Sequence, residues 1–357
     1  MTEQGAQKHR ILMSDYDYYL PEELIAQVPL EDRAASRLMV LNRQTGDIVH
    51  SMFRQLAEFL LPGDLLVFND SRVIPARLRI MRKSGGAGEL LLLQSDDATG
   101  EWKALGRPAR RLRAGETVTV LPAEDGAIEA SGATIAGRDE SGLLRVCLDP
   151  EVESDLDAYG SVPLPPYITA ELRDRERYQT VYSHDRGSAA APTAGLHFTE
   201  ETLAALRKAG VATAFVTLHV GLDTFRPVTA EYAEDHQIHT EWCSVSEEAI
   251  RAIRVCKARG GRVVAVGTTS ARTIETLGRH LDVGDEDGFS GPTDIFITPG
   301  YEWKVVDGLF TNFHLPKSTL MLMVSALAGR DRIMRAYAEA IAERYRFFSF
   351  GDAMLII

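Results

Sequence analysis

The sequence predicts an α/β protein with a mainly parallel sheet flanked by helices, interrupted by a small six-stranded antiparallel β-barrel. Apolar runs rich in β-branched residues alternate with amphipathic segments of helical length in both outer parts of the chain, which is the pattern of a sheet covered by helices. Between them, short alternating segments are separated by glycine, proline and acidic turns, which is typical of a barrel. We therefore expect the first part of the α/β domain at residues 1–75, with a loose tail at 1–13, the inserted barrel at 76–154, and the remainder of the α/β domain at 155–357.

The elements of the α/β domain follow from apolar runs and from the residues that start and stop helices. Strands are expected at residues 37–42, 65–68, 211–218, 262–266, 294–298, 304–312 (a pair of strands) and 354–357. Helices are expected at residues 21–27, 53–61, 171–177, 200–209, 246–259, 271–277, 317–328 and 332–345. Because strands and helices alternate after the barrel, the sheet is expected to be largely parallel.

The barrel prediction rests on six short segments that occur in close succession. They are residues 77–83, 89–94, 101–107, 117–121, 127–136 and 143–148. Arginines cluster on two parts of this region, and Arg77, Arg110 and Arg111 are the candidates for contacts to nucleic-acid phosphates. The alternative is that these arginines are simply exposed to solvent at the rim of the barrel and bind no ligand, which is the usual situation of charged residues on such strands.

Charge and cysteine content narrow the class of protein. The chain of 357 residues carries a formal net charge of −12, so its overall field does not favour nucleic acid, and any such binding needs local basic patches. Three cysteines without metal or redox spacing fit a reducing cytoplasm. No apolar stretch has membrane-spanning length, so no membrane partner is expected, and the chain is expected to act as a monomer or weak homodimer.

The segment 262–277 predicts a buried strand, a sharp turn at Gly267 and the start of a helix. Thr268, Thr269 and Ser270 stand where a helix needs hydroxyl acceptors for its first N–H groups. Capping alone is one interpretation. The other is a binding site for a carboxylate or other anion, because the N-terminus of a helix offers free N–H groups and the positive end of a dipole.

Polar residues also follow the other predicted strands, where ligands of open α/β sheets collect. These clusters contain His197, His219, Glu241, Arg272 and His314. A metal-dependent hydrolase using His236, His239 and Glu241 is an alternative, because histidine and glutamate bind zinc. However, the metalloprotease signature of two histidines four residues apart is absent.

Seven stretches then carry a resemblance to a known family. They are residues 62–77, 191–199, 215–228, 266–270, 293–297, 311–320 and 346–354. With them, the chain from about residue 14 to 357 resembles the S-adenosylmethionine:tRNA ribosyltransferase-isomerases of queuosine biosynthesis. Departures are minor: Ala271, Asp223 and Cys243 replace the residues expected there, and only Asp223 adds a carboxylate beside the site.

The resemblance implies an α/β domain with an inserted barrel and an unusual reaction. The ribosyl part of S-adenosylmethionine moves to 7-aminomethyl-7-deazaguanine at the wobble position of a tRNA anticodon and rearranges to epoxyqueuosine, while adenine and methionine leave. S-adenosylmethionine is thus a consumed substrate, and neither a cofactor nor a metal is implied. The partner is a tRNA that carries the deazaguanine precursor.

This chemistry needs a base, an acid and groups that hold the ribose and the methionine carboxylate. The expected proton-handling residues are His197, His219, Glu241, Asp294 and His314. The expected substrate-binding residues are Asn69, Arg72, Arg226, Thr268, Thr269, Ser270, Arg272, Asn312 and Lys317. Which residue is the base stays open. Besides the hydrolase, a non-catalytic RNA-binding protein that uses the arginines of the barrel is the remaining alternative.

Overall fold

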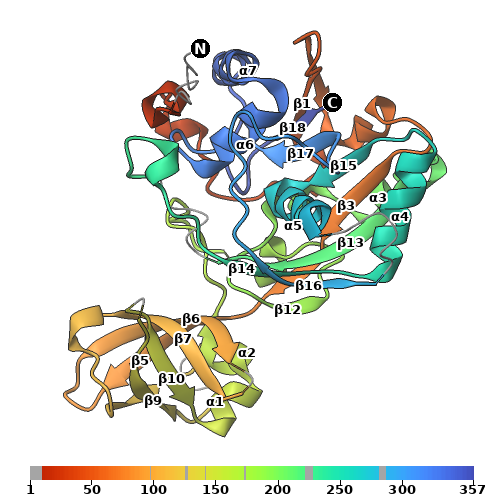
Figure 1. The fold of residues 1–357 in the computed structure, drawn as a ribbon. Helices are drawn as coiled ribbons and strands as arrows, with labels where there is room; N and C mark the ends of the chain where they lie inside the picture. The colour runs from red at the N-terminus through yellow and green to blue at the C-terminus, as the bar shows by residue number, and fades with distance from the viewer. Residues whose placement is uncertain are drawn as a thin grey trace, which may run out of the picture.

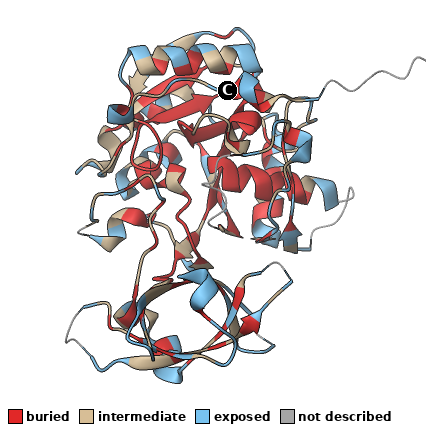
Figure 2. Cartoon of the chain, turned by 90° about the vertical axis from the view of Figure 1, so that its left-hand side faces the viewer, coloured by how far each residue is buried: buried red, intermediate tan, exposed pale blue. Residues whose placement is uncertain are grey.

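The computed structural model describes residues 10–96, 98–124, 128–140, 142–172, 174–221, 228–280 and 287–357. These residues form an α/β body with a nine-stranded sheet and a separate antiparallel barrel, joined by extended segments (Figure 1). Buried residues are concentrated in the strands and helices at the centre of the body, and exposed residues lie on its outside (Figure 2). No helix in the described ranges combines the length and apolarity needed to cross a bilayer.

The centre of the large sheet is parallel and both of its edges are antiparallel. Its order is β16-β14-β13-β3-β15-β17-β18-β1-β2. The strands are β1 (Arg37–Leu41), β2 (Ile48–Met52), β3 (Leu65–Asn69), β13 (Ala212–His219), β14 (Glu241–Val245), β15 (Val263–Val266), β16 (Phe289–Thr293), β17 (Gly308–Asn312) and β18 (Ala353–Ile356). The neighbours β13, β3, β15 and β17 pair in parallel, which confirms the prediction for the core. Their carboxyl ends therefore meet at one edge of the sheet.

Helices cover this sheet and bury its apolar residues. They are α3 (Glu200–Lys208), α4 (Glu247–Ala258), α5 (Gly267–His280), α6 (Thr319–Ala328) and α7 (Arg330–Ala342). All eleven residues from 267 to 277 in α5 are buried, because this helix lies across β13, β3, β15 and β17 rather than at the surface. The polar residues at its start are thus buried within the body rather than spread over its surface.

The barrel closes as predicted, with six strands in the described residues. They are β5 (Arg77–Arg82), β6 (Ala87–Asp96), β7 (Glu101–Arg107), β8 (Thr117–Val120), β9 (Ser131–Arg138) and β10 (Leu144–Leu148). Their order is β5-β6-β7-β10-β9-β8, and a pairing of β5 with β8 completes the circle. Inward residues such as Ile80, Leu92 and Val146 form its core. The barrel leaves the body after β4 (Ser71–Val73), and the short strand β11 (Gly160–Ser161) pairs with β5 where the chain leaves the barrel.

Several predicted elements are wrong. Residues 294–298 are not a strand, since the edge strand is β16, and the expected strand pair at 304–312 is the single strand β17. The helices expected at 21–27, 53–61 and 171–177 are short 3-10 helices. Within the expected loose tail, residues 10–13 are ordered, and Leu12 bridges to Tyr232.

Candidate functional site

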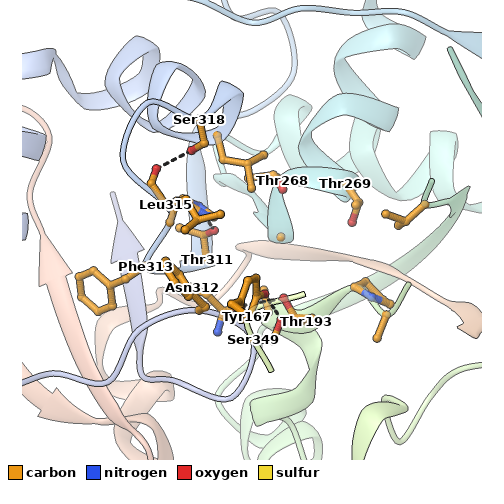
Figure 3. A pocket seen from close by; sticks show the side chains of 18 residues that line it. Tyr167, Thr193, Thr268, Thr269, Thr311, Asn312, Phe313, Leu315, Ser318 and Ser349 are labelled. Carbon is orange, nitrogen blue, oxygen red and sulfur yellow. Dashed lines mark hydrogen bonds between the residues drawn. The ribbon is translucent and has the colours of Figure 1, made fainter. Parts of the chain in front are cut away.

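Two of the cavities lined by described residues meet at the beginning of α5. The smaller, with a volume of about 60 Å³, lies between the end of β17, the 3-10 helix η7 (Thr193–His197) and the first turn of α5 (Figure 3). The larger, with a volume of about 890 Å³, lies between barrel strands β6 and β7 and the body elements β14 and α5. We call them the small cavity and the large cleft. Thr268 and Thr269 line both, so these two residues form a shared wall.

The interpretation of the three hydroxyls as helix caps is wrong. The helix already begins at Gly267, whose φ of +87° is in the left-handed region that favours glycine. Ser270 lies inside the first turns and donates its hydroxyl to the carbonyl of Val266 at 2.8 Å. The hydroxyl of Thr269 is buried and has no hydrogen-bond partner among the described residues. Thr268 and Thr269 thus line both cavities, whereas the Ser270 hydroxyl is used within the helix.

An ion pair between Arg272 and Glu241 forms part of the wall of the large cleft. The Nη1 of Arg272 donates to Oε2 of Glu241, and the other carboxylate oxygen accepts the N–H of Gly221 at 2.8 Å. Both side chains are buried, with exposed fractions of 8% and 6%. The remaining guanidinium nitrogens, Nε and Nη2, are buried without a partner in the described structure. Glu241 therefore holds Arg272 in place, which leaves one side of the guanidinium group available.

His197 lies behind Asn312, a residue of the small cavity, and holds its side chain in place. Its Nε2 accepts the side-chain N–H of Asn312 at 3.0 Å, and its Nδ1 lies 2.7 Å from the hydroxyl of Ser36. The amide oxygen of Asn312 in turn accepts the hydroxyl of Thr193 at 3.3 Å. Burial, reinforced by the charges of two nearby arginines, lowers the pKa of His197 to about 3. This histidine therefore orients Asn312 as a neutral hydrogen-bonding group.

His314 is a second neutral histidine of the small cavity. Its Nε2 lies 2.8 Å from the hydroxyl of Thr311, and its backbone N–H donates to Tyr337 at 3.0 Å. Burial lowers its pKa to about 3. Both histidines of this region are thus uncharged at neutral pH and are weak bases.

His219 lies in the large cleft at the end of β13. Its ring stacks on Trp242, with centroids 5.8 Å apart and planes at 17°, and its Nε2 is 3.4 Å from a carboxylate oxygen of Asp185. Burial lowers the pKa of His219, and its Nδ1 has no partner in the part of the chain that the structure describes. Of the predicted proton-handling residues, this one combines contact with the cleft and an unused ring nitrogen.

Two predicted site residues, Asp294 and Asn69, lie outside the described lining of both cavities. Asp294 is exposed and does not belong to the described lining of either cavity. Asn69 is buried and binds the backbone of Leu218 through both of its side-chain ends, at 3.0 and 3.1 Å, which ties the end of β3 to β13. Both ends of its side chain are therefore used within the protein.

Two predicted cations are paired at the surface. Arg72 donates to Glu176 at 2.5 Å, and the Nζ of Lys317 lies 2.7 Å from a carboxylate oxygen of Asp17. Neither arrangement reaches the cavities as the described residues define them. Arg226 lies outside the described residues.

The arginines predicted to contact tRNA lie away from the large cleft. Arg77 pairs with Glu89 at 3.8 Å, and Arg110 lines a different surface cavity on the barrel. Arg111 is exposed in the same short 3-10 helix as Arg110. The described barrel residues that face the cleft include Trp102 and Lys103 instead.

The metal interpretation finds no geometric support. The ring of His236 packs against Phe296 with centroids 5.8 Å apart, and Glu241 is engaged by Arg272. In the described ranges, no three histidine, cysteine, aspartate or glutamate side chains gather as metal ligands would.

Sequence reasoning did not select Trp242 or Tyr167. Trp242 is 41% exposed and lines the large cleft. The signal present in the sequence is the alternation of polar and apolar residues around Trp242, which follows Glu241 directly. Tyr167 lines the small cavity, and its hydroxyl lies 2.6 Å from that of Ser349. It follows a proline-rich stretch that the pattern alone indicates as a linker.

The chain is similar to known proteins over nearly its whole length. A model of the family described as "Queuosine biosynthesis protein" matches residues 13–356. The S-adenosylmethionine:tRNA ribosyltransferase-isomerase of Caldanaerobacter subterraneus subsp. tengcongensis is 53% identical over 349 residues, which is 96% of this chain and 99% of that protein. The protein of the same name from a Thermoanaerobacter species is 52% identical with the same coverage.

A solved structure is similar as well. The crystal structure of an S-adenosylmethionine tRNA ribosyltransferase from Thermotoga maritima matches with 41% sequence identity and a TM-score of 0.56, covering 96% of this chain and 100% of that one. The family match includes every residue that lines the small cavity and the large cleft.

Proposed function

The chain belongs to the family of queuosine biosynthesis proteins, and we propose on this basis that it acts as an S-adenosylmethionine:tRNA ribosyltransferase-isomerase. The enzyme transfers the ribosyl moiety of S-adenosylmethionine to 7-aminomethyl-7-deazaguanine at the wobble position of tRNA. The moiety isomerises to give epoxyqueuosine, and adenine and methionine are released. S-adenosylmethionine is consumed, so the reaction as written requires no resident cofactor.

The observation that supports this function is the meeting of two cavities of different character at Thr268 and Thr269. The reaction joins a small substrate to a base of a large one, so two binding spaces must share a wall at the reacting atoms. Hydroxyl and amide groups of the small cavity suit a ribosyl group. The large cleft has room for the target base, because an unpaired anticodon base can be splayed out at modest cost.

Within this assignment, His219 is the proposed proton-transfer residue. The carbon next to the sulfonium is acidified, and a positioned base must remove its proton. His219 lines the cleft and has an unused Nδ1, and Asp185 near its Nε2 would stabilise the imidazolium once the proton is taken. Burial lowers the pKa of His197 and of His314 to about 3. Both ring nitrogens of His197 and the Nε2 of His314 are engaged by neighbouring side chains, so we assign these two histidines to positioning.

The test measures free adenine. Wild-type protein should release adenine only when S-adenosylmethionine and precursor-bearing tRNA are both present. His219→Gln should lower the rate by about 100-fold, as expected when a general base is removed, whereas the surface variant His50→Gln should not. Release of adenine without tRNA, or none with both substrates, would contradict the function. Activity that needs zinc would favour a hydrolase, and tRNA binding without adenine release would favour an RNA-binding protein.

We also propose that the protein works in the cytoplasm as a monomer or weak homodimer. Its three cysteines, Cys147, Cys243 and Cys256, are free, which suits a reducing compartment, and its tRNA substrate is a cytoplasmic molecule.

A further inference from the structure

One side of the Arg272 guanidinium group is unpaired in the buried wall of the large cleft. Glu241 takes Nη1, whereas Nε and Nη2 have no partner among the described residues. The side chain is only 8% exposed. Buried charged N–H groups without partners are costly, so this arrangement indicates a place for a ligand that completes it. The Nε and Nη2 hydrogens point the same way and match two oxygens of one planar anion.

A second, independent observation points to the same ligand. The hydroxyl of Thr269 is buried without a partner in the described structure, and Thr269 lines the cleft together with Arg272. The two residues are three apart in α5, so they lie on one face of the helix. This face is at the N-terminus of a 14-residue helix, where free N–H groups and the dipole favour negative charge.

The charge of the site indicates which anion fits. Glu241 already balances Arg272 in a buried pair, so the site offers directed N–H and O–H donors and a helix dipole rather than a large net positive charge. This suits a single planar carboxylate better than a tRNA phosphate, which is bound well by exposed cations. We propose that the free side of Arg272 and the Thr269 hydroxyl bind one carboxylate. Resting on the proposed function, this is the methionyl carboxylate of S-adenosylmethionine.

Glu241 acts on this site as a positioning residue. Its two oxygens are fixed at opposite ends, by Arg272 Nη1 and by the backbone N–H of Gly221 at 2.8 Å. The guanidinium plane is therefore set before the ligand arrives, which reduces the entropy lost on binding. Glu241, which the sequence suggests as a proton-handling residue, thus acts by orienting Arg272.

The test compares the affinities of S-adenosylmethionine and decarboxylated S-adenosylmethionine by titration calorimetry. Wild type should prefer the carboxylate form on the order of 100-fold, the value of two charge-assisted hydrogen bonds. Arg272→Lys should reduce this preference to about tenfold or less, because an ammonium cannot make the paired contact. Glu241→Gln should also reduce the preference, since the guanidinium group loses its fixed orientation.

Thr269→Val tests the same site if Arg272→Lys folds poorly. The hydroxyl that it removes has no partner among the described residues, so its loss breaks no hydrogen bond within the protein. It should reduce the preference about tenfold. Ser325→Ala is the matched control, since Ser325 in α6 also has a buried hydroxyl without a described partner but lies outside the described lining of both cavities. Its preference should equal that of wild type.

The outcomes separate the two proposals. An unchanged preference in both Arg272→Lys and Thr269→Val overturns the carboxylate site, whether or not adenine is released. If Arg272→Lys instead weakens tRNA binding and leaves the preference intact, the occupant is a phosphate and the inference is also overturned. A wild-type protein that shows the preference but releases no adenine with both substrates supports the carboxylate site and contradicts the proposed function.

Discussion

The small cavity and the large cleft share a wall but differ in charge, because the first is lined by neutral side chains and the second by several charged ones. The small cavity is lined by hydroxyl, amide and apolar groups. The buried His314 in its lining and the buried His197 behind Asn312 both have pKa values of about 3. The large cleft contains the Arg272–Glu241 pair, Lys103 and Arg186. The two sides of the first turn of α5 can therefore receive different parts of the substrates, uncharged parts on one side and charged parts on the other. A neutral cavity holds sugar hydroxyls without trapping ions, and a charged cleft attracts the anionic groups.

The largest expected effect tests the neutrality of the small cavity through pH. His197 and His314 stay neutral in the folded protein down to a pKa of about 3, whereas unfolded histidine protonates near its ordinary value of 6.5. The unfolded state therefore binds more protons below pH 6.5, and stability falls as pH falls from 6.5 towards 3. Between pH 6 and pH 4 the two histidines together should cost roughly 5 kcal/mol.

Urea denaturation over this pH range measures the effect. His314→Gln should remove about half of the pH-dependent loss. A stability that is flat between pH 6 and pH 4 would show that these histidines are charged in the folded protein and that the cavity is not neutral.

Asn312→Asp tests the same neutrality by placing a carboxylate in the small cavity. The new charge would be buried beside His197 and should raise the pKa of that imidazole, because an opposite charge favours the protonated form. We expect kcat/KM for adenine release to fall about 100-fold, since the oriented amide is lost and a buried charge is costly. Asn42→Asp in an exposed turn is the matched control. An unchanged kcat/KM would remove Asn312 from the site.

Trp242→Ala tests whether the large cleft receives a nucleic-acid base. Stacking of a base on an aromatic side chain contributes about 1–3 kcal/mol, so tRNA affinity should fall about tenfold or more while the affinity for S-adenosylmethionine stays the same. Tyr19→Ala, at a tyrosine that is 83% exposed, serves as the control in the same filter-binding or fluorescence assay. A loss confined to S-adenosylmethionine would place the small substrate, not the base, against Trp242.

The smallest expected effect compares single cations of the barrel. Lys103 faces the large cleft, whereas Arg110 lines a separate surface. Lys103→Gln should reduce the slope of log affinity for tRNA against log salt by about one, and Arg110→Gln should leave it unchanged. The reverse result would favour the surface that the clustering of arginines in the sequence indicates.

Local pattern was sufficient for the parts of the fold that depend on local physics. The apolar run of β15 followed by Gly267 specifies a buried strand and a turn, and six alternating segments specify a barrel. The edge of the sheet was not predictable in this way. Residues 294–298 have the more strand-like composition, yet the strand is β16, with Gly291 and Pro292, because an edge position beside β14 tolerates proline.

The sequence predicted where the candidate site lies, but not which of its residues bind each other. The carboxyl ends of the parallel strands placed His219, Thr269 and Asn312 at one edge of the sheet. Whether a polar residue faces a ligand or its own protein depends on partners far along the chain. Glu241 is 31 residues from Arg272, and His197 is 115 residues from Asn312, so no local pattern distinguishes their roles from that of a proton donor.

The wall formed by Thr268 and Thr269 has a consequence for the order of events in solution. A ligand on one side of it orders side chains that also touch the other side, and the conformational entropy lost on the first binding event is not lost again on the second. Reciprocity then requires that S-adenosylmethionine and tRNA raise each other's affinity by the same factor. The affinity of each substrate can be measured with and without an unreactive form of the other. We expect the ratio of the two affinities to be the same for both substrates and greater than one. A ratio of one would show that binding on one side of the wall does not affect binding on the other.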